Sequence, residues 1–415
     1  MRLFGSGGHL RHQRLQTVLT IAAIATAVAL PVVLLGVGGG VSSHELSNLQ
    51  NAGYQIVISA AGLHGIANAH RLTGQLLALP EVAAASPVLS IAVDAFPPGK
   101  GAVPSLAEGV IPDQFAPTLG PTEDGLFPQP LPLGDPTDLV HYDNGTYAGP
   151  ATYDVLVSSP FAQAYHLAVG STLGLAPVPN ATEAVPYSVT GVFGVPLGTL
   201  GQTGAFALLL PLSDLQVMTG YARGAGTPVV DAADSVEVAA AGAVSTEPGA
   251  LAALQRQIQA MVPYYTVSTL SQQAAQLQTA ASVLTGFYLA LSSVGLTIGL
   301  VFLALVLLRR VESDRRSIGI RRALGLPPRA VVGPVVAEGL AIAAIGAVAG
   351  IVGGIALVDG LAAWGSGAVQ EAADLAIFVP ATMAELAGAV VVLALVAGGL
   401  AARSALRLDL LEALR

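Results

Sequence analysis

The segment AASVLTGFYLALSSVGLTIGLVFLALVLL, residues 280–308, contains no charged side chain. A helix needs about 20 apolar residues to cross the hydrocarbon core of a bilayer, so this segment is long enough to be a span. Three other runs are similarly apolar, at 15–43, 330–358 and 386–402. The run at 330–358 contains one charge, Glu338. The run at 386–402 is short for a span and can begin earlier, within LAIFVPATMA at 375–384. The sequence therefore predicts four transmembrane helices, at residues 15–43, 279–308, 330–358 and 386–402.

The composition agrees with a membrane protein that has a large polar part. Of 415 residues, 53% are hydrophobic and only 10% are charged, whereas a soluble domain carries about 25% charge. The net charge of −9 argues against a nucleic-acid partner, whose binding proteins present a basic face. The chain has no cysteine, which excludes disulfides, thiol catalysis and zinc sites built from cysteine.

The first apolar run has one alternative interpretation, a cleaved signal peptide. Arg2, Arg11 and Arg14 precede it and resemble the charged start of such a peptide. The apolar core of a signal peptide is only about 7–15 residues long, however, and this run is longer. We therefore expect an uncleaved anchor.

The arginines predict the orientation. Thirteen of the seventeen basic residues lie in the tail 1–14, the loop 309–329 and the tail 403–415. Basic residues accumulate on the cytoplasmic side of membrane proteins. We expect both termini and the 309–329 loop in the cytoplasm, with residues 44–278 and 359–385 outside. The chain is then a multi-pass protein of the plasma (inner) membrane.

Residues 44–278 predict an extracytoplasmic α/β (α+β) domain, inserted between transmembrane helices 1 and 2. Runs rich in β-branched and aromatic residues between Gly and Pro indicate strands. A Pro-rich stretch at 97–136 indicates an irregular insertion, and residues 266–280 indicate a helical stalk leading to the second span. The predicted strands are 54–60, 82–96, 153–159, 187–194, 205–211 and 234–240, and the predicted helices are 66–79, 212–219 and 248–261.

Motifs for catalysis or metal binding are weak. The chain's one lysine, Lys100, lies in PPGKGA, which lacks the Gly spacing and the Ser/Thr of a Walker A motif, so we predict no ATP site in this chain. His64 and His70 are six positions apart, unlike the i, i+4 pair of a zinc site, and we expect surface or capping roles. Asp135, Asp138 and Asp143 allow calcium binding, but their spacing differs from that of an EF-hand and favours a solvated loop. We therefore predict no catalytic residue and no metal site.

Glu338 lies inside the third apolar run, where an ionisable side chain is a candidate functional residue. If the helix begins near Arg329, a rise of about 1.5 Å per residue places Glu338 roughly 14 Å along the axis. From there the side chain can reach the cytoplasmic headgroups. Two readings stay open, a polar contact between packed helices and a mechanistic role.

The cytoplasmic loop contains a short predicted helix. Ser317 can cap a helix from Ile318 to Leu324, which ends at Gly325 before two prolines. A short amphipathic helix between two spans can bind a groove of a cytoplasmic partner, or it can simply anchor to lipid headgroups. Side chains three and four apart share a face, so one face carries Ile320, Ala323 and Leu324, and another carries Ile318, Arg321 and Arg322.

These segments together resemble the MacB/LolC/FtsX-type permease subunits of ABC transporters. RSIGIRRALGLPPRAVVGPVVAEGLAIAAIGAVAG at 316–350 is similar to the family's loop and third span, and ARSALRLDLLEALR at 402–415 to its ending. The outer segments YDVLVSSPFAQAYHLAVGSTLGL (153–175), YSVTGVF (187–193) and LLLPLSDLQVMTG (208–220) resemble the MacB-type periplasmic core domain. Ser317 stands where the family usually has a glutamate, so a contact of that acid is not implied here.

The resemblance implies a non-catalytic subunit that works as a homodimer, or as a heterodimer with a related permease. A dimer of cytoplasmic ATPase subunits would hold ATP and Mg²⁺, and hydrolysis would move the outer domain by mechanotransmission, for export or extraction of a lipoprotein, peptide or drug-like substrate. Two alternatives are an FtsX-like signal transducer that controls an extracytoplasmic hydrolase or adaptor, and a membrane-anchored enzyme. The residues expected to couple to the ATPase are Ser317, Ile318, Gly319, Ile320, Arg321, Arg322, Ala323, Leu324 and Gly325.

Overall fold

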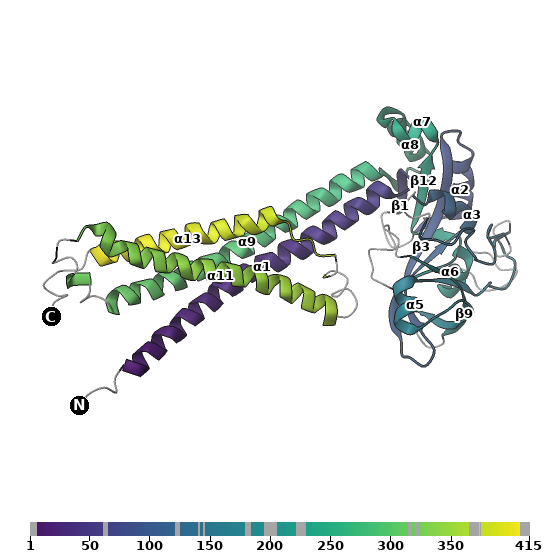
Figure 1. The fold of residues 1–415 in the computed structure, drawn as a ribbon. Helices are drawn as coiled ribbons and strands as arrows, with labels where there is room; N and C mark the ends of the chain where they lie inside the picture. The colour runs from purple at the N-terminus through teal and green to yellow at the C-terminus, as the bar shows by residue number, and fades with distance from the viewer. Residues whose placement is uncertain are drawn as a thin grey trace. The chain divides into compact units, whose positions relative to one another are not determined.

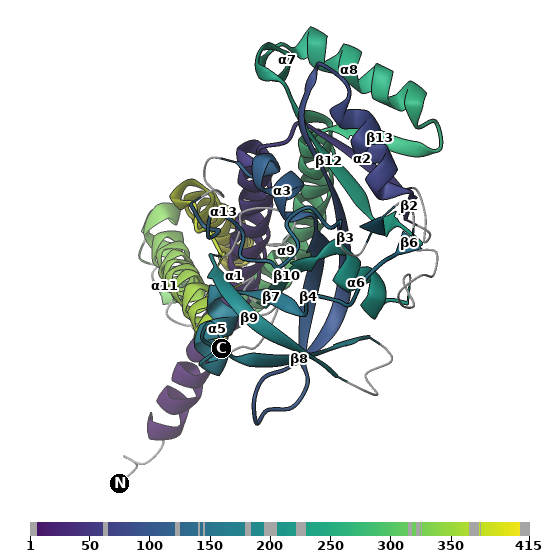
Figure 2. The ribbon, with the colours of Figure 1, turned by 90° about the vertical axis from the view of Figure 1, so that its right-hand side faces the viewer.

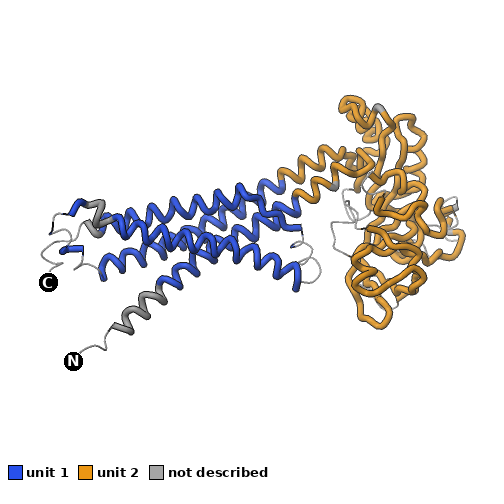
Figure 3. Tube along the Cα trace, viewed as in Figure 1, with its two compact units in different colours: residues 1–42, 280–415 blue, residues 43–279 orange. Residues whose placement is uncertain are grey.

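The computed structural model describes two compact units, residues 1–42 with 280–415 and residues 43–279 (Figure 3). Each unit is described below by itself. The residues described are 6–60, 65–120, 125–139, 142–143, 146–178, 184–194, 206–220, 230–313, 318–320, 324, 326–364, 373 and 375–406.

Four long helices, each long and apolar enough to cross a membrane, account for the first unit (Figure 1). All four extend beyond the predicted apolar runs, because the polar residues that flank each run remain helical. The fourth begins at Pro380, inside LAIFVPATMA, which gives the short 386–402 run the length that it lacks by itself. The helices are α1 (Ser6–Asn51), α9 (Leu270–Ser313), α11 (Pro328–Trp364) and α13 (Pro380–Leu406).

Helices α1 and α11 approach each other closely along a series of glycines. A Cβ added at Gly346 or Gly354 would lie 2.8 or 2.9 Å from the side chain of Ile24 or Val32. At Gly350 it would lie 2.6 Å from both the Ala25 carbonyl oxygen and the Val28 Cβ. Small residues at this spacing allow the backbones of two helices to approach. Val28 and Val32 are fully buried as a result.

The second unit is built on a nine-stranded mixed sheet with the order β13-β1-β12-β3-β4-β10-β7-β9-β8. The α/β character predicted for this segment is confirmed. Six strands and two helices lie close to where the sequence predicts them: β1 (Ile56–Ala60), β3 (Val82–Phe96), β7 (Asp154–Ser158), β9 (Val185–Phe193), β10 (Ala207–Pro211), β12 (Ser235–Ala240), α6 (Leu212–Met218) and α8 (Pro248–Met261).

The Pro-rich stretch 97–136 is not wholly irregular, which corrects the prediction. It contains β4 (Val103–Val110), a strand in the middle of the sheet, followed by α3 (Pro112–Phe115) and a 3₁₀ turn. Proline removes a ladder donor and is tolerated near strand ends. Pro104 is the second residue of β4 and pairs only with Asp94 of β3, because the pairing with β10 begins at Leu106.

Two other local predictions are wrong in part. The stalk helix begins at Leu270 rather than Thr266, because β13 (Tyr265–Thr269) pairs with β1 and extends the sheet. The predicted 66–79 helix is shorter, since β2 (Ile66–Ala67) pairs with β11 (Ala232–Ala233) before α2 (Ala69–Leu77) begins. The remaining elements of this unit are β5 (Tyr142–Asp143), β6 (Thr146–Tyr147), β8 (Thr172–Pro177), α5 (Ser159–Tyr165) and α7 (Gly242–Thr246).

The sheet is covered by two groups of helices over separate apolar cores. One core joins β1, β12 and β13 to α2 and α8, and Ile56, Ile58 and Ile258 are fully buried in it. A second core lies under α5 and α6, and Phe161 and Leu215 are fully buried there. A third core packs α3 against β4, β7, β9 and β10. Figure 2 shows α8 and α2 beside β13 and β12, away from α5 and β9.

Candidate functional site

The described residues between α9 and α11 include helical ones where the sequence predicts the coupling helix. Ile318, Gly319 and Ile320 are helical, and the backbone N–H of Leu324 donates to the carbonyl of Ile320 at 3.0 Å. Ser317, Arg321, Arg322, Ala323 and Gly325 lie outside the described residues.

This segment has a buried side and an exposed side. Ile318 is 6% exposed and packs in the apolar cluster that also contains Leu307 and Val311 of α9. Ile320 and Leu324 are 47% and 75% exposed. Because these two residues are one turn apart, they form an apolar edge that the first unit leaves uncovered.

Glu338 forms an ion pair with the guanidinium of Arg310, through Oε1 and Nη1. The Nη2 group of Arg310 donates to Thr17 Oγ1 at 2.8 Å. One arginine therefore joins α1, α9 and α11. We call Thr17, Arg310 and Glu338 the Arg310 clasp. Of the two readings, the geometry shows the polar contact between packed helices.

Arg310 was missed as a partner at the sequence level, because it reads as one more positive charge on the cytoplasmic side. A signal for it exists. An acid in an apolar helix requires a partner, and Arg309 and Arg310 are the cations at the end of the preceding apolar run, which is a candidate neighbour of the helix that contains Glu338. The two arginines differ in burial, since Arg309 is exposed and Arg310 is half-buried.

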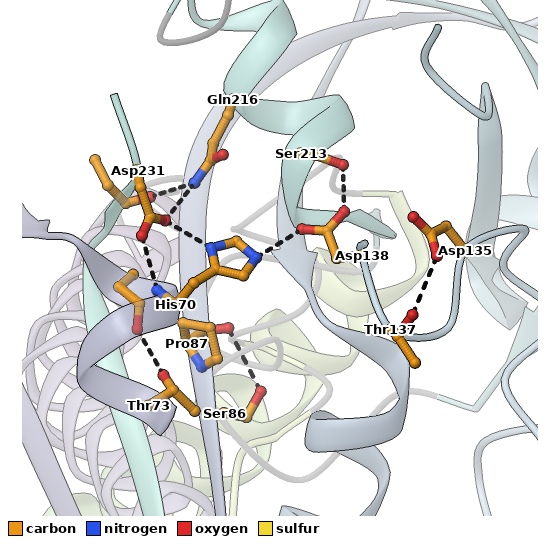
Figure 4. A network of polar contacts seen from close by, with 12 residues as sticks. His70, Thr73, Ser86, Pro87, Asp135, Thr137, Asp138, Ser213, Gln216 and Asp231 are labelled. Carbon is orange, nitrogen blue, oxygen red and sulfur yellow. Dashed lines mark hydrogen bonds and ion pairs between the residues drawn. The ribbon is translucent and has the colours of Figure 1, made fainter. Parts of the chain in front are cut away.

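His70, at the start of α2, is held between two carboxylates in the second unit (Figure 4). Its Nδ1 lies 2.8 Å from Asp231 Oδ1 and its Nε2 lies 3.1 Å from Asp138 Oδ2. Tyr142 stacks on the ring, with centroids 4.0 Å apart. Burial alone would lower the pKa of His70, but the hydrogen bonds and charges of Asp138 and Asp231 raise it from 6.5 to about 9.

This network corrects two predictions about polar residues. His70 is neither a surface residue nor a simple cap, since only 12% of its side chain is exposed. Asp138 does not lie in a solvated loop, because it is fully buried and accepts a hydrogen bond from Ser213 Oγ. Asp231 also accepts from Gln216 Nε2 at 3.4 Å, so the network ties α2 to α6. His64 lies outside the described residues.

In the part of the chain that the structure describes, the network neither forms a metal-binding group nor lines the cavity of this unit. Within the described ranges, no three His, Cys, Asp or Glu side chains are placed to hold a metal ion. A cavity of about 530 Å³ does lie in this unit, but its lining contains none of the network residues and no His, Asp, Glu, Lys or Arg.

Four membrane-length helices, with an α/β unit between the first and second, define a permease-type architecture. Two family models match the chain. The MacB-like periplasmic core domain matches residues 17–271, and the FtsX-like permease C-terminal domain matches residues 289–410. The chain belongs to the MacB/FtsX-type permease family of ABC transporters. Members of this family are non-catalytic permease subunits that work in the membrane with cytoplasmic ATPases.

Solved structures give distant likenesses. The periplasmic region of MacB from Actinobacillus actinomycetemcomitans is 13% identical, with a TM-score of 0.37, and the match covers 56% of this chain and 97% of that one. The extracellular domain of the noncanonic ABC-type transporter YknZ from Gram-positive bacteria is 12% identical, with a TM-score of 0.33, over 52% of this chain and 98% of that one. No curated protein matches the chain. The family assignment rests on the two family models.

Proposed function

We propose that this chain is the transmembrane subunit of an ABC transporter that couples ATP hydrolysis to movement of an extracytoplasmic domain. The four long helices cross the plasma membrane, with both termini and the 309–329 loop in the cytoplasm. A separate ATPase dimer binds ATP and Mg²⁺, and this chain pairs with a second copy or with a related permease. The work done is mechanotransmission for export or extraction of a lipoprotein, peptide or drug-like substrate.

One observation carries the proposal, the apolar edge formed by Ile320 and Leu324. Exposed leucine and isoleucine next to a strongly basic loop are unfavourable in water, and a groove on a partner would cover them. Ile318, on the other side of the same turn, is anchored in the helix cluster. A partner that binds the edge is therefore mechanically connected to the membrane helices.

Leu324→Asp tests the proposal, because it places a charge at the centre of the expected contact. Burying an unpaired charge is strongly unfavourable, so the variant should insert normally but lose the ATPase. Arg309→Gln is the matched control, since Arg309 is exposed and lies outside the turn. The measurement is affinity purification at matched membrane levels, with mass spectrometry of an ATPase subunit carrying Walker A and signature motifs.

The wild type and Arg309→Gln should retain that ATPase, and Leu324→Asp should not. If Leu324→Asp retains the ATPase while Arg309→Gln loses it, the turn is a lipid anchor and the coupling function is refuted. If the wild type itself binds no such ATPase, the whole assignment as a transporter subunit fails.

A further inference from the structure

We propose that Arg310 is a positioning residue that transmits movement of the cytoplasmic turn to helix α1. This inference rests on the proposed function and adds a route for the movement. Leu307, Arg310 and Val311 are on the last turns of α9. The route runs from the cytoplasmic turn to these residues, and from them to α11 and α1.

The first step joins the turn to α9. Ile318 shares one buried cluster with Leu307 and Val311, which are 0% and 3% exposed. Interiors packed in this way do not deform freely, so a displacement of Ile318 moves its neighbours. Val311 directly follows Arg310, and the turn therefore acts on the end of α9 that carries the guanidinium.

The second step joins α9 to α11 and α1 through the guanidinium. Arginine presents several N–H donors in a rigid planar fork, so one side chain can bind two partners in fixed directions. Here Nη1 binds Glu338 of α11, and Nη2 binds Thr17 of α1 at 2.8 Å. Apolar packing supports the same junction, since a Cβ added at Gly339 would lie 2.9 Å from Leu307 Cδ1.

The third step carries the movement along α1. Beyond the clasp, Gly346, Gly350 and Gly354 of α11 bring the backbones of α1 and α11 into direct contact.

A lysine at position 310 has one compact ammonium and cannot reproduce the fork. Arg309, its exposed neighbour, has the same charge and provides an internal control.

The experiment uses the full chain in lipid nanodiscs with the ATPase identified by the purification above. Because the chain has no cysteine, spin labels can be attached to the substitutions Ser43→Cys in α1 and Ala280→Cys in α9 without background. The distance between the labels is measured with and without ATP, Mg²⁺ and vanadate. The variants are Arg310→Gln, Arg310→Lys, Arg309→Gln and the charge-exchanged pair Arg310→Glu with Glu338→Arg.

We expect Arg310→Gln to retain the ATPase, because the Ile320–Leu324 edge is intact, and to lose the nucleotide-dependent change in distance. Arg310→Lys should reduce that change, Arg309→Gln should preserve it, and the charge-exchanged pair should restore part of it. A full nucleotide-dependent change in Arg310→Gln would overturn the inference and leave the proposed function standing. If Arg310→Gln does not insert into the membrane, a full nucleotide-dependent change in Arg310→Lys would overturn the inference instead. A wild type that binds no ATPase overturns both.

Discussion

Raising the pH should destabilise the α/β domain that contains His70. The folded domain keeps the proton of His70 up to a higher pH than the unfolded chain does. The pKa of His70 is about 9 in the folded domain, against an ordinary value of 6.5 for a histidine in the unfolded chain. A pKa that is raised on folding contributes stability below the unfolded value, and the contribution is lost as the pH rises through the folded value. The loss should therefore develop between about pH 6.5 and pH 9.

The size of the effect follows from the shift. At about 1.4 kcal/mol per pKa unit, the move from 6.5 to about 9 corresponds to about 3 kcal/mol. Roughly 2 kcal/mol of this should disappear between about pH 7 and pH 9.5. In a domain of this size each kcal/mol shifts the melting temperature by about 2–4 °C, so we expect a fall of about 4–8 °C.

The assay is thermal unfolding of residues 45–275, followed by circular dichroism from pH 7 to pH 9.5, with His70→Gln as the control. Glutamine can occupy the site but cannot carry the proton, so its melting temperature should change far less over this range. Tyr142 stacks on His70, and desolvation raises its pKa above 10, so its titration lies outside the window. Parallel losses of stability in the wild type and in His70→Gln would refute this account of the network.

Three further outcomes are expected. Residues 45–275 expressed alone should unfold cooperatively with a mixed α/β spectrum, since the apolar cores of the sheet lie within them; a gradual transition would show that the long helices complete the core. Gly350→Ala should lower the thermal stability of the purified full chain by roughly 1–3 kcal/mol through overpacking, whereas Gly353→Ala, with nothing within 4 Å, should not; equal effects would exclude close approach of α1 and α11. Single cysteines at Val169, which is 67% exposed, and at Ser366 should react with an impermeant thiol reagent on intact cells and one at Ser313 should not; reaction at Ser313 would reverse the orientation.

The sequence predicts those parts of the fold that depend on local pattern. Runs such as IVISA at 56–60 combine β-branched residues with neighbouring turn residues, and the four apolar runs are long, so these elements are found where expected. Strand β4 escapes prediction because Pro104 and the prolines before and after the strand argue locally against a strand, while pairing with β3 and β10 on either side stabilises it. Tertiary pairing routinely overrides such local preferences.

The polar sites are harder to predict because their partners are distant along the chain. His70 meets carboxylates 68 and 161 residues away, and Arg310 meets Thr17 at a separation of 293. The glycines of α11 show the same limit. In the sequence Gly350 and Gly353 are equivalent, but only Gly350 faces a neighbouring helix.

Strands β1 and β13 are adjacent and antiparallel, and the two long helices enter and leave the outer unit at the same end of this pair. Ile56 follows α1 and stands opposite Thr269, which directly precedes α9. The N–H of Leu270 donates to the Gln55 carbonyl at 3.0 Å, closing that end. A force that separates the two helices would therefore break the hydrogen bonds between β1 and β13 one after another, starting at this end. A force along both helices in the same direction would act on all of these hydrogen bonds together. The β1–β13 pair should therefore resist a force along both helices better than a force that separates them.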